Sequence, residues 1–421
     1  MGEIDVLILS WHQVYLSGYA GGYIRLQEFL KRAPPKLKYC ILDNTPSIYK
    51  DISGKSRVIE YNSPFIIRIL KKNLFYVWFL FEIFFTIYAL YRNGREIIKT
   101  RKPKVLYIPI GEFPHTYFPA IFLKIRFPKI KVVIDILNFG IPERSPSPSY
   151  IYKLLRKSSV NMFRGIIMVI TGYTQFFFVS RTINYVDYVF TVSSELVDVI
   201  KRIYIKNSID YTPSGVNINK DPLININRKK YLAVYVGRMT VQKGIFNLLQ
   251  VWTELVKNKP DVKLALVGFA DELTKKVISK NIKELRIENN VDCYYGVSEK
   301  EKNKILSESE LFLHLATFEP LFPVIGILEG FAYGLPAIVY DMDAITSYKT
   351  NNKLKGFLHI VENGDIRATL KKILQCSKLQ KNTKTKNAQD SIKYAEQFDW
   401  DIIAAKEFKV ISQFVNNPTY V

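Results

Sequence analysis

A basic, glycine-containing loop lies near the middle of the sequence. The segment Leu232–Gly244 runs LAVYVGRMTVQKG, an apolar stretch followed by Gly237-Arg238 and then by Lys243. A strand that runs into a helix leaves free backbone N–H groups and a positive dipole end at the loop, to which Arg238 and Lys243 add two cations. Such a loop is suited to bind a diphosphate, and a solvated basic loop is the alternative for this stretch alone. The helix is predicted from apolar residues that recur at helical spacing, at Ile245, Leu248, Leu249, Trp252, Leu255 and Val256.

Two glutamates lie in a second segment, after an expected strand at Leu311–Ala316. The chain continues there from Phe318 to Pro336 as FEPLFPVIGILEGFAYGLP, which contains Glu319 and Glu329. An ionised carboxylate accepts hydrogen bonds and can take two hydroxyl donors. Either glutamate could therefore hold a sugar, and an acid at a helix N-terminus is the structural alternative, above all for Glu329.

Together the two segments resemble the donor-binding half of glycosyltransferase family 4, and the match is strongest over Tyr231–Asp341. The family consists of retaining enzymes with two facing Rossmann-like domains. The resemblance implies that Glu329 holds the ribose hydroxyls of a nucleotide sugar. It implies that Glu319 and the backbone after it, including Gly326, hold the sugar. One departure is the spacing of the glutamates, which is about eight residues in the family and ten here, where the loop also carries Pro323. Either the sugar-contacting loop has two extra residues, or Glu319 has lost its role.

Other positions follow from the same resemblance. Gly237 belongs to the family's Gly-Arg turn. A Gly-Gly loop after the first strand, here Gly21-Gly22, faces the donor across the inter-domain cleft in the family. Many members carry a histidine near the end of a later strand, where this chain has Asp135. Both a catalytic function for Asp135 and that of an ordinary strand-end acid stay open.

The architecture expected from the residues is an open α/β sheet, because strand-like runs alternate with helical stretches. With the resemblance it becomes two facing Rossmann-like α/β domains with a cleft between them, the GT-B type. We expect residues 1–213 to face the acceptor and the membrane, and residues 214–395 to bind the donor. The resemblance implies that residues 396–421 form a helix that crosses back onto the N-terminal domain, and Phe398-Asp399-Trp400 is expected to open it. The expected strands are Ile4–Leu9, Leu37–Leu42, Arg57–Tyr61, Val105–Pro109, Lys131–Asp135, Tyr188–Ser193, Lys263–Gly268, Asp292–Tyr295 and Ala337–Tyr340.

Composition points to anionic partners other than nucleic acid. The chain of 421 residues carries a formal net charge of +22, yet it has no zinc-finger, basic-zipper or RNA-binding signature. Three widely spaced cysteines and the absence of a secretory signal favour a cytoplasmic protein. The lysine cluster Lys378–Lys386 is expected to be a solvated loop, and His314 a core histidine.

Two apolar stretches, Asn73–Tyr91 and Met162–Ser180, are long enough to cross a bilayer. A spanning segment between strands of one parallel sheet would divide that sheet across the membrane. Its backbone N–H and C=O groups would then lack hydrogen-bond partners, which is prohibitively costly. We therefore expect both stretches to pack partly on the N-terminal domain and partly to enter the anionic cytoplasmic leaflet. A pair of helices buried against the sheet is the alternative.

The sequence thus predicts a retaining glycosyltransferase with a nucleotide-sugar donor and a saccharide acceptor that is lipid-linked or close to a membrane. No metal and no cofactor are expected, because the two cations of the basic loop can meet the charge of a leaving diphosphate. An epimerase of the same architecture, and a nucleotide-sugar-binding protein without catalysis, are the alternatives.

Overall fold

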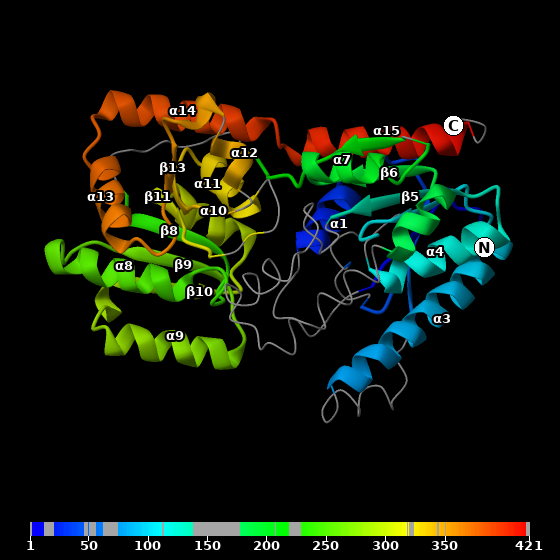
Figure 1. Ribbon diagram of the computed structural model, residues 1–421, viewed down its shortest axis with the longest axis horizontal. Helices are drawn as coiled ribbons and strands as arrows, with labels where there is room; N and C mark the ends of the chain where they lie inside the picture. Colours follow the sequence, from blue (N-terminus) through cyan, green and yellow to red (C-terminus); the bar gives the residue numbers. More distant parts are fainter. Residues whose placement is uncertain are drawn as a thin grey trace. The chain divides into compact units, whose positions relative to one another are not determined.

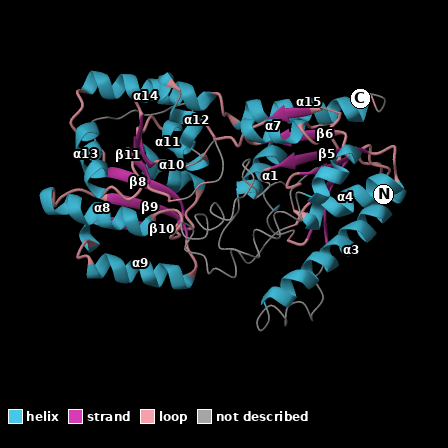
Figure 2. Cartoon of the chain, viewed as in Figure 1, coloured by secondary structure: helices cyan, strands magenta, loops and turns pink. Residues whose placement is uncertain are grey.

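The computed structural model describes residues 2–11, 21–45, 49, 56–61, 75–111, 113–137, 177–206, 208–218, 229–317, 319, 324–342, 345–349 and 351–417. They form two compact units, one of which contains Ser214–Trp400. The other contains the described residues up to Pro213 together with those from Asp401 onward. Each unit consists of a sheet with helices packed on it (Figures 1 and 2).

The first unit contains a seven-stranded sheet in the order β3-β2-β1-β4-β5-β6-β7, in which all neighbouring strands pair in parallel. Apolar residues fill both faces of its inner strands, as expected of a parallel sheet covered on two sides. The strands are β1 (Val6–Leu9), β2 (Tyr39–Asp43), β3 (Ser56–Glu60), β4 (Val105–Ile108), β5 (Lys131–Ile136), β6 (Tyr188–Thr191) and β7 (Ile209–Tyr211).

Helices from both ends of the chain cover this sheet. Leu26 and Phe29 of α1 share one core with Phe408 and Ile411 of α15, and the rings of Phe29 and Phe408 stack at 3.9 Å. Helices α3 and α4 pack against each other and against β1, β2, β4 and β5. The helices are α1 (Gly21–Lys31), α3 (Phe75–Arg101), α4 (Pro114–Arg126), a segment at 177–182, the short 3-10 helix η2 (Ile183–Tyr185), α7 (Ser194–Lys201) and α15 (Trp400–Asn416).

The second unit contains a six-stranded parallel sheet in the order β10-β9-β8-β11-β12-β13. Side chains of β8 alternate between two cores, with Val234 and Val236 in one and Ala233 and Tyr235 in the other. The strands are β8 (Tyr231–Arg238), β9 (Leu264–Phe269), β10 (Val291–Tyr295), β11 (Ser309–His314), β12 (Ala337–Tyr340) and β13 (Leu358–Val361).

Helices line both cores of this unit, which gives it three layers. Residues of α8, α9 and α13 contribute to one core, and residues of α10, α11 and α14 to the other. The helices are α8 (Ile245–Asn258), α9 (Glu272–Glu284), η3 (Glu288–Asn290), α10 (Glu299–Ser307), α11 (Ile325–Ala332), α12 (Thr346–Lys349), η5 (Asn352–Leu354), α13 (Ile366–Ser377) and α14 (Lys381–Glu396). Two Rossmann-like α/β units are the fold class that the sequence predicts.

Every expected strand overlaps an observed one, but three details of the sequence interpretation are wrong. The lysine cluster at Lys378–Lys386 is not a loop, because α14 begins at Lys381 and its later turns pack on α11. Gly21-Gly22 opens α1 instead of preceding it in a loop. The short strands β7 and β13 are additional to those expected.

The two apolar stretches are only partly described. Residues from Phe75 onward form α3, where Glu82 and Leu90 are buried and Phe84 is exposed, so one side of the stretch packs on its unit as expected. Most of the second stretch lies outside the described residues. No helix in the described part of the chain combines the length and apolar composition needed to span a membrane.

Candidate active site

The basic loop is held against the end of a neighbouring strand. Strand β8 ends at Arg238, and α8 begins after Gly244, whose φ of +73° lies in the left-handed region. A Cβ on Gly244 would stand 1.7 Å from the carbonyl oxygen of Leu315, just after β11. Thr317 also donates its backbone N–H to the carbonyl of Gln242. Only glycine fits this contact, which sets the start of α8 beside the ends of β8 and β11.

Both cations of the loop lie at this edge of the sheet. The Lys243 ammonium forms an ion pair with Oε1 of Glu319. Arg238, the last residue of β8, is exposed. Lys243 and Glu319, which the sequence places in separate segments, are therefore in direct contact.

Glu319 is buried and ionised because two donors act on its carboxylate. Burial by itself would raise its pKa, but the hydrogen bond from His314 and the charge of Lys243 outweigh it and lower the pKa to about 2. Since that carboxylate can only accept, Nε2 of His314 must donate, at 2.9 Å from Oε1. Among the described residues, the donors to this carboxylate are His314 and Lys243, and both bond to Oε1.

His314 is a functional candidate that the sequence interpretation assigned to the core. It is buried as expected, at the end of β11, with its ring parallel to that of Tyr235 at 6.4 Å. A polar residue at the last position of a buried strand, shortly before a motif glutamate, is the signal that could have revealed it.

A second helix starts at the same edge. Helix α11 begins after Val324, and a Cβ on Gly326 would approach the carbonyl oxygen of Val236 in β8 to 3.0 Å. Neither α8 nor α11 has a side-chain cap on its first N–H groups among the described residues. Both helices therefore begin at the carboxyl edge of β8 and β11, the edge at which Lys243 lies, and positive helix ends at that edge favour an anion.

Glu329, in the second turn of α11, is paired with a cation of its own. Its Oε1 accepts from Lys302 of α10, which also contacts Glu299 at 3.0 Å. Burial opposes the charge of Lys302, but the two carboxylates raise the pKa of the ammonium above its usual value. Lys302 fixes the orientation of Glu329, a contact that neither residue's own segment indicates.

Asp135 and Gly22 belong to the first unit, where they lie at the ends of β4 and β5. The Asp135 carboxylate is buried and accepts from Tyr107 at 2.8 Å and from Arg25 at 3.2 Å. Burial, and then the charge of Glu407, raise the pKa of Asp135 well above its usual range. A Cβ on Gly22 would stand 2.8 Å from the end of the Leu137 side chain, so the packing here favours a small residue. A catalytic function for Asp135 stays a prediction.

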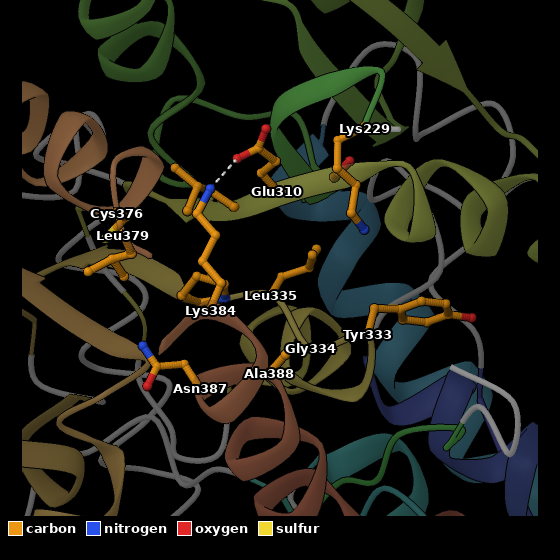
Figure 3. Close-up of a pocket in the computed structure, with 13 residues that line it drawn as sticks. Lys229, Glu310, Tyr333, Gly334, Leu335, Cys376, Leu379, Lys384, Asn387 and Ala388 are labelled. Atoms are coloured by element: carbon orange, nitrogen blue, oxygen red, sulfur yellow. Dashed lines mark hydrogen bonds and ion pairs between the residues drawn. The ribbon is translucent and has the colours of Figure 1, made fainter. Parts of the chain in front are cut away.

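A pocket opens at the opposite edge of the second sheet, where β11 and β12 begin (Figure 3). Lys229, Glu310, Cys376 and Lys384 line it, and Lys384 bonds to Glu310 at 3.2 Å. Because ligands of open parallel sheets bind at the carboxyl ends of the strands, this pocket is separate from the candidate site.

The described residues hold no group of three or more His, Cys, Asp or Glu side chains that could bind a metal ion. The groups available to an anionic ligand at the edge of the second sheet are Lys243, Arg238 and the two helix starts.

A comparison with protein families identifies the kind of domain that carries this site. Residues 218–397 match the family described as "Glycosyl transferases group 1". The second unit is a glycosyltransferase group 1 domain. Within this glycosyltransferase domain lie Arg238, Lys243, Glu319, Gly326 and Glu329.

Two curated relatives are named as sugar-transferring enzymes, and the chain spans half of their length or less. The poly(glycerol-phosphate) α-glucosyltransferase of Bacillus subtilis is 23% identical over 214 residues, which cover 50% of this chain and 30% of that protein. The α-monoglucosyldiacylglycerol synthase of Acholeplasma laidlawii is 24% identical over 205 residues, covering 42% of this chain and 50% of that protein.

Solved structures extend the likeness of fold over both units. A glycosyltransferase from Rickettsia africae has a TM-score of 0.63 and 16% identity, and covers 99% of both chains. The Anabaena protein HepE, solved with UDP and glucose, has a TM-score of 0.65 and 14% identity over 97% of this chain and 100% of its own. The glycosyltransferase domain and the first unit together have the GT-B fold.

Proposed function

We propose that this protein is a retaining glycosyltransferase that moves a sugar from a nucleoside-diphosphate sugar to a saccharide acceptor. The observation that carries the proposal is that the Lys243–Glu319 pair and the starts of α8 and α11 lie at the same edge of the second sheet. Cations and helix ends stabilise a leaving diphosphate, while an ionised carboxylate beside them can hold sugar hydroxyls.

Each residue has a distinct role in this proposal. Arg238 and Lys243 bind the diphosphate, and Glu319 accepts from the sugar through Oε2. Glu329, held by Lys302, accepts from the ribose hydroxyls. The diphosphate competes with Glu319 for Lys243, so donor binding redistributes the charge of that ammonium. The reaction then proceeds without a metal ion, because protein groups supply the positive charge.

The acceptor in this proposal is a lipid-linked saccharide at an anionic membrane surface. One supporting relative is named for a diacylglycerol product, which is a membrane lipid. The formal net charge of +22 also favours an anionic surface. Transfer then occurs at the inner face of the membrane, with the protein associated peripherally.

The first experiment is a thermal-shift screen over nucleoside diphosphates and nucleotide sugars. A ligand that binds only the folded protein raises its apparent stability. We therefore expect nucleotides with one kind of base to raise the unfolding temperature of the second unit. That donor is then incubated with membrane lipid extract, with and without a strong chelator. We expect sugar transfer that depends on the extract, survives the chelator and keeps the anomeric configuration by NMR.

Other results would contradict the proposal in recognisable ways. Release of nucleotide without any acceptor would indicate an epimerase-type reaction, and binding without turnover would indicate a non-catalytic protein. Loss of transfer in chelator, restored by magnesium or manganese, would refute metal independence alone.

A further inference from the structure

One face of α3 changes from aromatic to basic along its length. Phe81, Phe84 and Tyr88 are between 56% and 70% exposed. The exposed basic residues Arg92, Arg95 and Lys99 continue the same stripe, since all six recur every three or four positions of the helix. Glu82, Thr86 and Leu90, on the other side, are buried. Figure 1 shows the N-terminal half of α3 extending beyond the sheet of its unit.

Two further segments widen the aromatic part. Phe122 of α4 meets Tyr91 of α3 edge to face at 6.3 Å. Phe118 contacts Phe122 at 6.2 Å and Phe178 at 5.6 Å, so the rings of three segments form one continuous surface. We call this surface the aromatic face. Its exposed members are Phe81, Phe84, Tyr88, Phe122, Ile125, Phe177 and Phe178.

Basic side chains border the aromatic face. The Arg181 guanidinium stacks 4.9 Å over the ring of Phe177, and Arg126 and Lys129 are exposed after the apolar part of α4. Among the described residues of α3, α4 and 177–185, Glu96 is the one exposed acid. Exposed apolar surface of this extent is uncommon on soluble proteins and marks an interaction site.

We propose that the aromatic face docks on an anionic bilayer leaflet, with its rings at the boundary between headgroups and acyl chains. The apolar and basic residues of α3 are separated along the helix axis, which rises about 1.5 Å per residue. Phe81–Tyr88 therefore extends about 10 Å and the basic stripe follows. This order matches the depth profile of an anionic leaflet, where aromatic groups lie below the phosphates that attract Lys and Arg.

A flat protein partner would fit this arrangement less well, because it has no reason to separate apolar from basic contacts along one axis. Helix α4 belongs to the proposed surface although its sequence was not among the two apolar stretches. The inference specifies the membrane partner of the proposed function and does not depend on any reaction.

The test is sedimentation of the full chain with phosphatidylcholine vesicles, either pure or mixed with phosphatidylglycerol. We expect binding to the mixed vesicles, weakened on the order of tenfold or more when Phe81, Phe84 and Tyr88 are all replaced by Ser. The pair Arg92→Glu and Arg95→Glu should lose only the preference for phosphatidylglycerol. Because these positions are exposed, far-UV circular dichroism and thermal unfolding should be unchanged in both variants.

The control variants are Ile205→Ser and Leu273→Ser, at side chains 82% and 73% exposed outside the aromatic face. They should bind vesicles as the unaltered protein does. No binding to mixed vesicles, or equal binding by the triple variant, would overturn the proposal. A dimer in solution that the triple variant abolishes would overturn it too, by showing a protein interface. No substrate enters this assay, so its failure is distinct from failure of sugar transfer.

Discussion

Glu319 accepts from His314 and Lys243 on a single oxygen, and this contact determines what the carboxylate can do. Two donors on Oε1 hold the side chain in one orientation and lower its pKa to about 2, so the carboxylate is ionised at neutral pH. A sugar hydroxyl then meets Oε2 without first having to orient the carboxylate. His314 is therefore a positioning residue in the proposed reaction, because it acts through Glu319.

His314→Leu should reduce kcat about ten- to a hundredfold, since a hydrogen bond to a charged group contributes about 1.5–3 kcal/mol. Affinity for the free nucleoside diphosphate should stay within about twofold, because Lys243 and the helix starts remain. His314→Gln keeps an N–H donor and should recover part of kcat. Steady-state kinetics and calorimetric titration of the diphosphate separate the two effects.

The matched control is His359→Leu, the same change at another histidine of this sheet, on β13. It should leave kcat as it is. If His314→Leu lowered nucleotide affinity as much as kcat, or if His314→Gln restored nothing, the positioning role would be excluded.

At the scale of elements, α8 and β11 meet through backbone atoms. The proposed diphosphate site depends on this contact, because it sets the first N–H groups of α8 beside the end of β11. Gly244 is the residue that permits it, for reasons of space as well as of φ.

Gly244→Ala should lower the free energy of unfolding of the second unit by more than about 2 kcal/mol and abolish diphosphate binding. Gly296→Ala is the control, because its φ is also left-handed, at +64°, while a Cβ there meets nothing within 4 Å. That variant should cost about 1–2 kcal/mol and leave diphosphate binding unchanged. Urea unfolding measures the stability, and calorimetry measures the diphosphate binding. An equal loss of unfolding free energy in the two variants would contradict a close contact between Gly244 and Leu315.

The sequence predicts elements better than it predicts their partners. Continuous apolar runs identified β1, β8 and β12, since a strand buried on both faces is apolar at every position. The sequence did not predict the first turns of α14, because Lys381–Lys386 has no apolar face that would indicate a helix. Its buried positions start only at Ala388, where the helix packs on α11. Lys243 could be selected from its segment, but its pairing with Glu319 arises only when two strands lie side by side.

At the scale of the whole molecule, Arg25 connects parts of the first unit that are far apart in the sequence. Its guanidinium, from α1, contacts Asp135 of β5, Glu407 of α15 and the carbonyl of Pro213. Asp135 was selected from the sequence as a strand-end acid. Its partners could not be, because Arg25 and Glu407 come from opposite ends of the chain and nothing local marks either of them.

Arg25→Met should destabilise the first unit by about 3–5 kcal/mol at neutral pH, because it leaves two buried carboxyl groups without a cation. Burial raises the pKa of Asp135 and of Glu407, so the folded variant binds more protons than the unfolded chain above their ordinary values. Its stability should therefore fall as pH rises from about 4 to 7 and recover on acidification. Urea unfolding across that pH range measures the effect.

Arg32→Met is the control, since Arg32 follows α1 directly and also pairs with α15, through Asp401, which is 62% exposed. Its second partner, Glu28, keeps an ion pair with Lys31 in that variant. A pair with one partner in solvent contributes about 0–1 kcal/mol. The interpretation fails if the two variants lose similar stability, or if Arg25→Met loses more at acidic pH.

The contribution of α15 to the first unit also determines when that unit can be completed during translation. The ribosome releases β1 to β7 before the second unit, and α15 after it. The second unit ends at Trp400 and can fold as soon as it has emerged. The first sheet must wait for Phe408, Ile411 and Phe414 to cover its apolar core. A nonsense codon just before α15 would thus spare the glycosyltransferase domain and leave the N-terminal unit as a chaperone client.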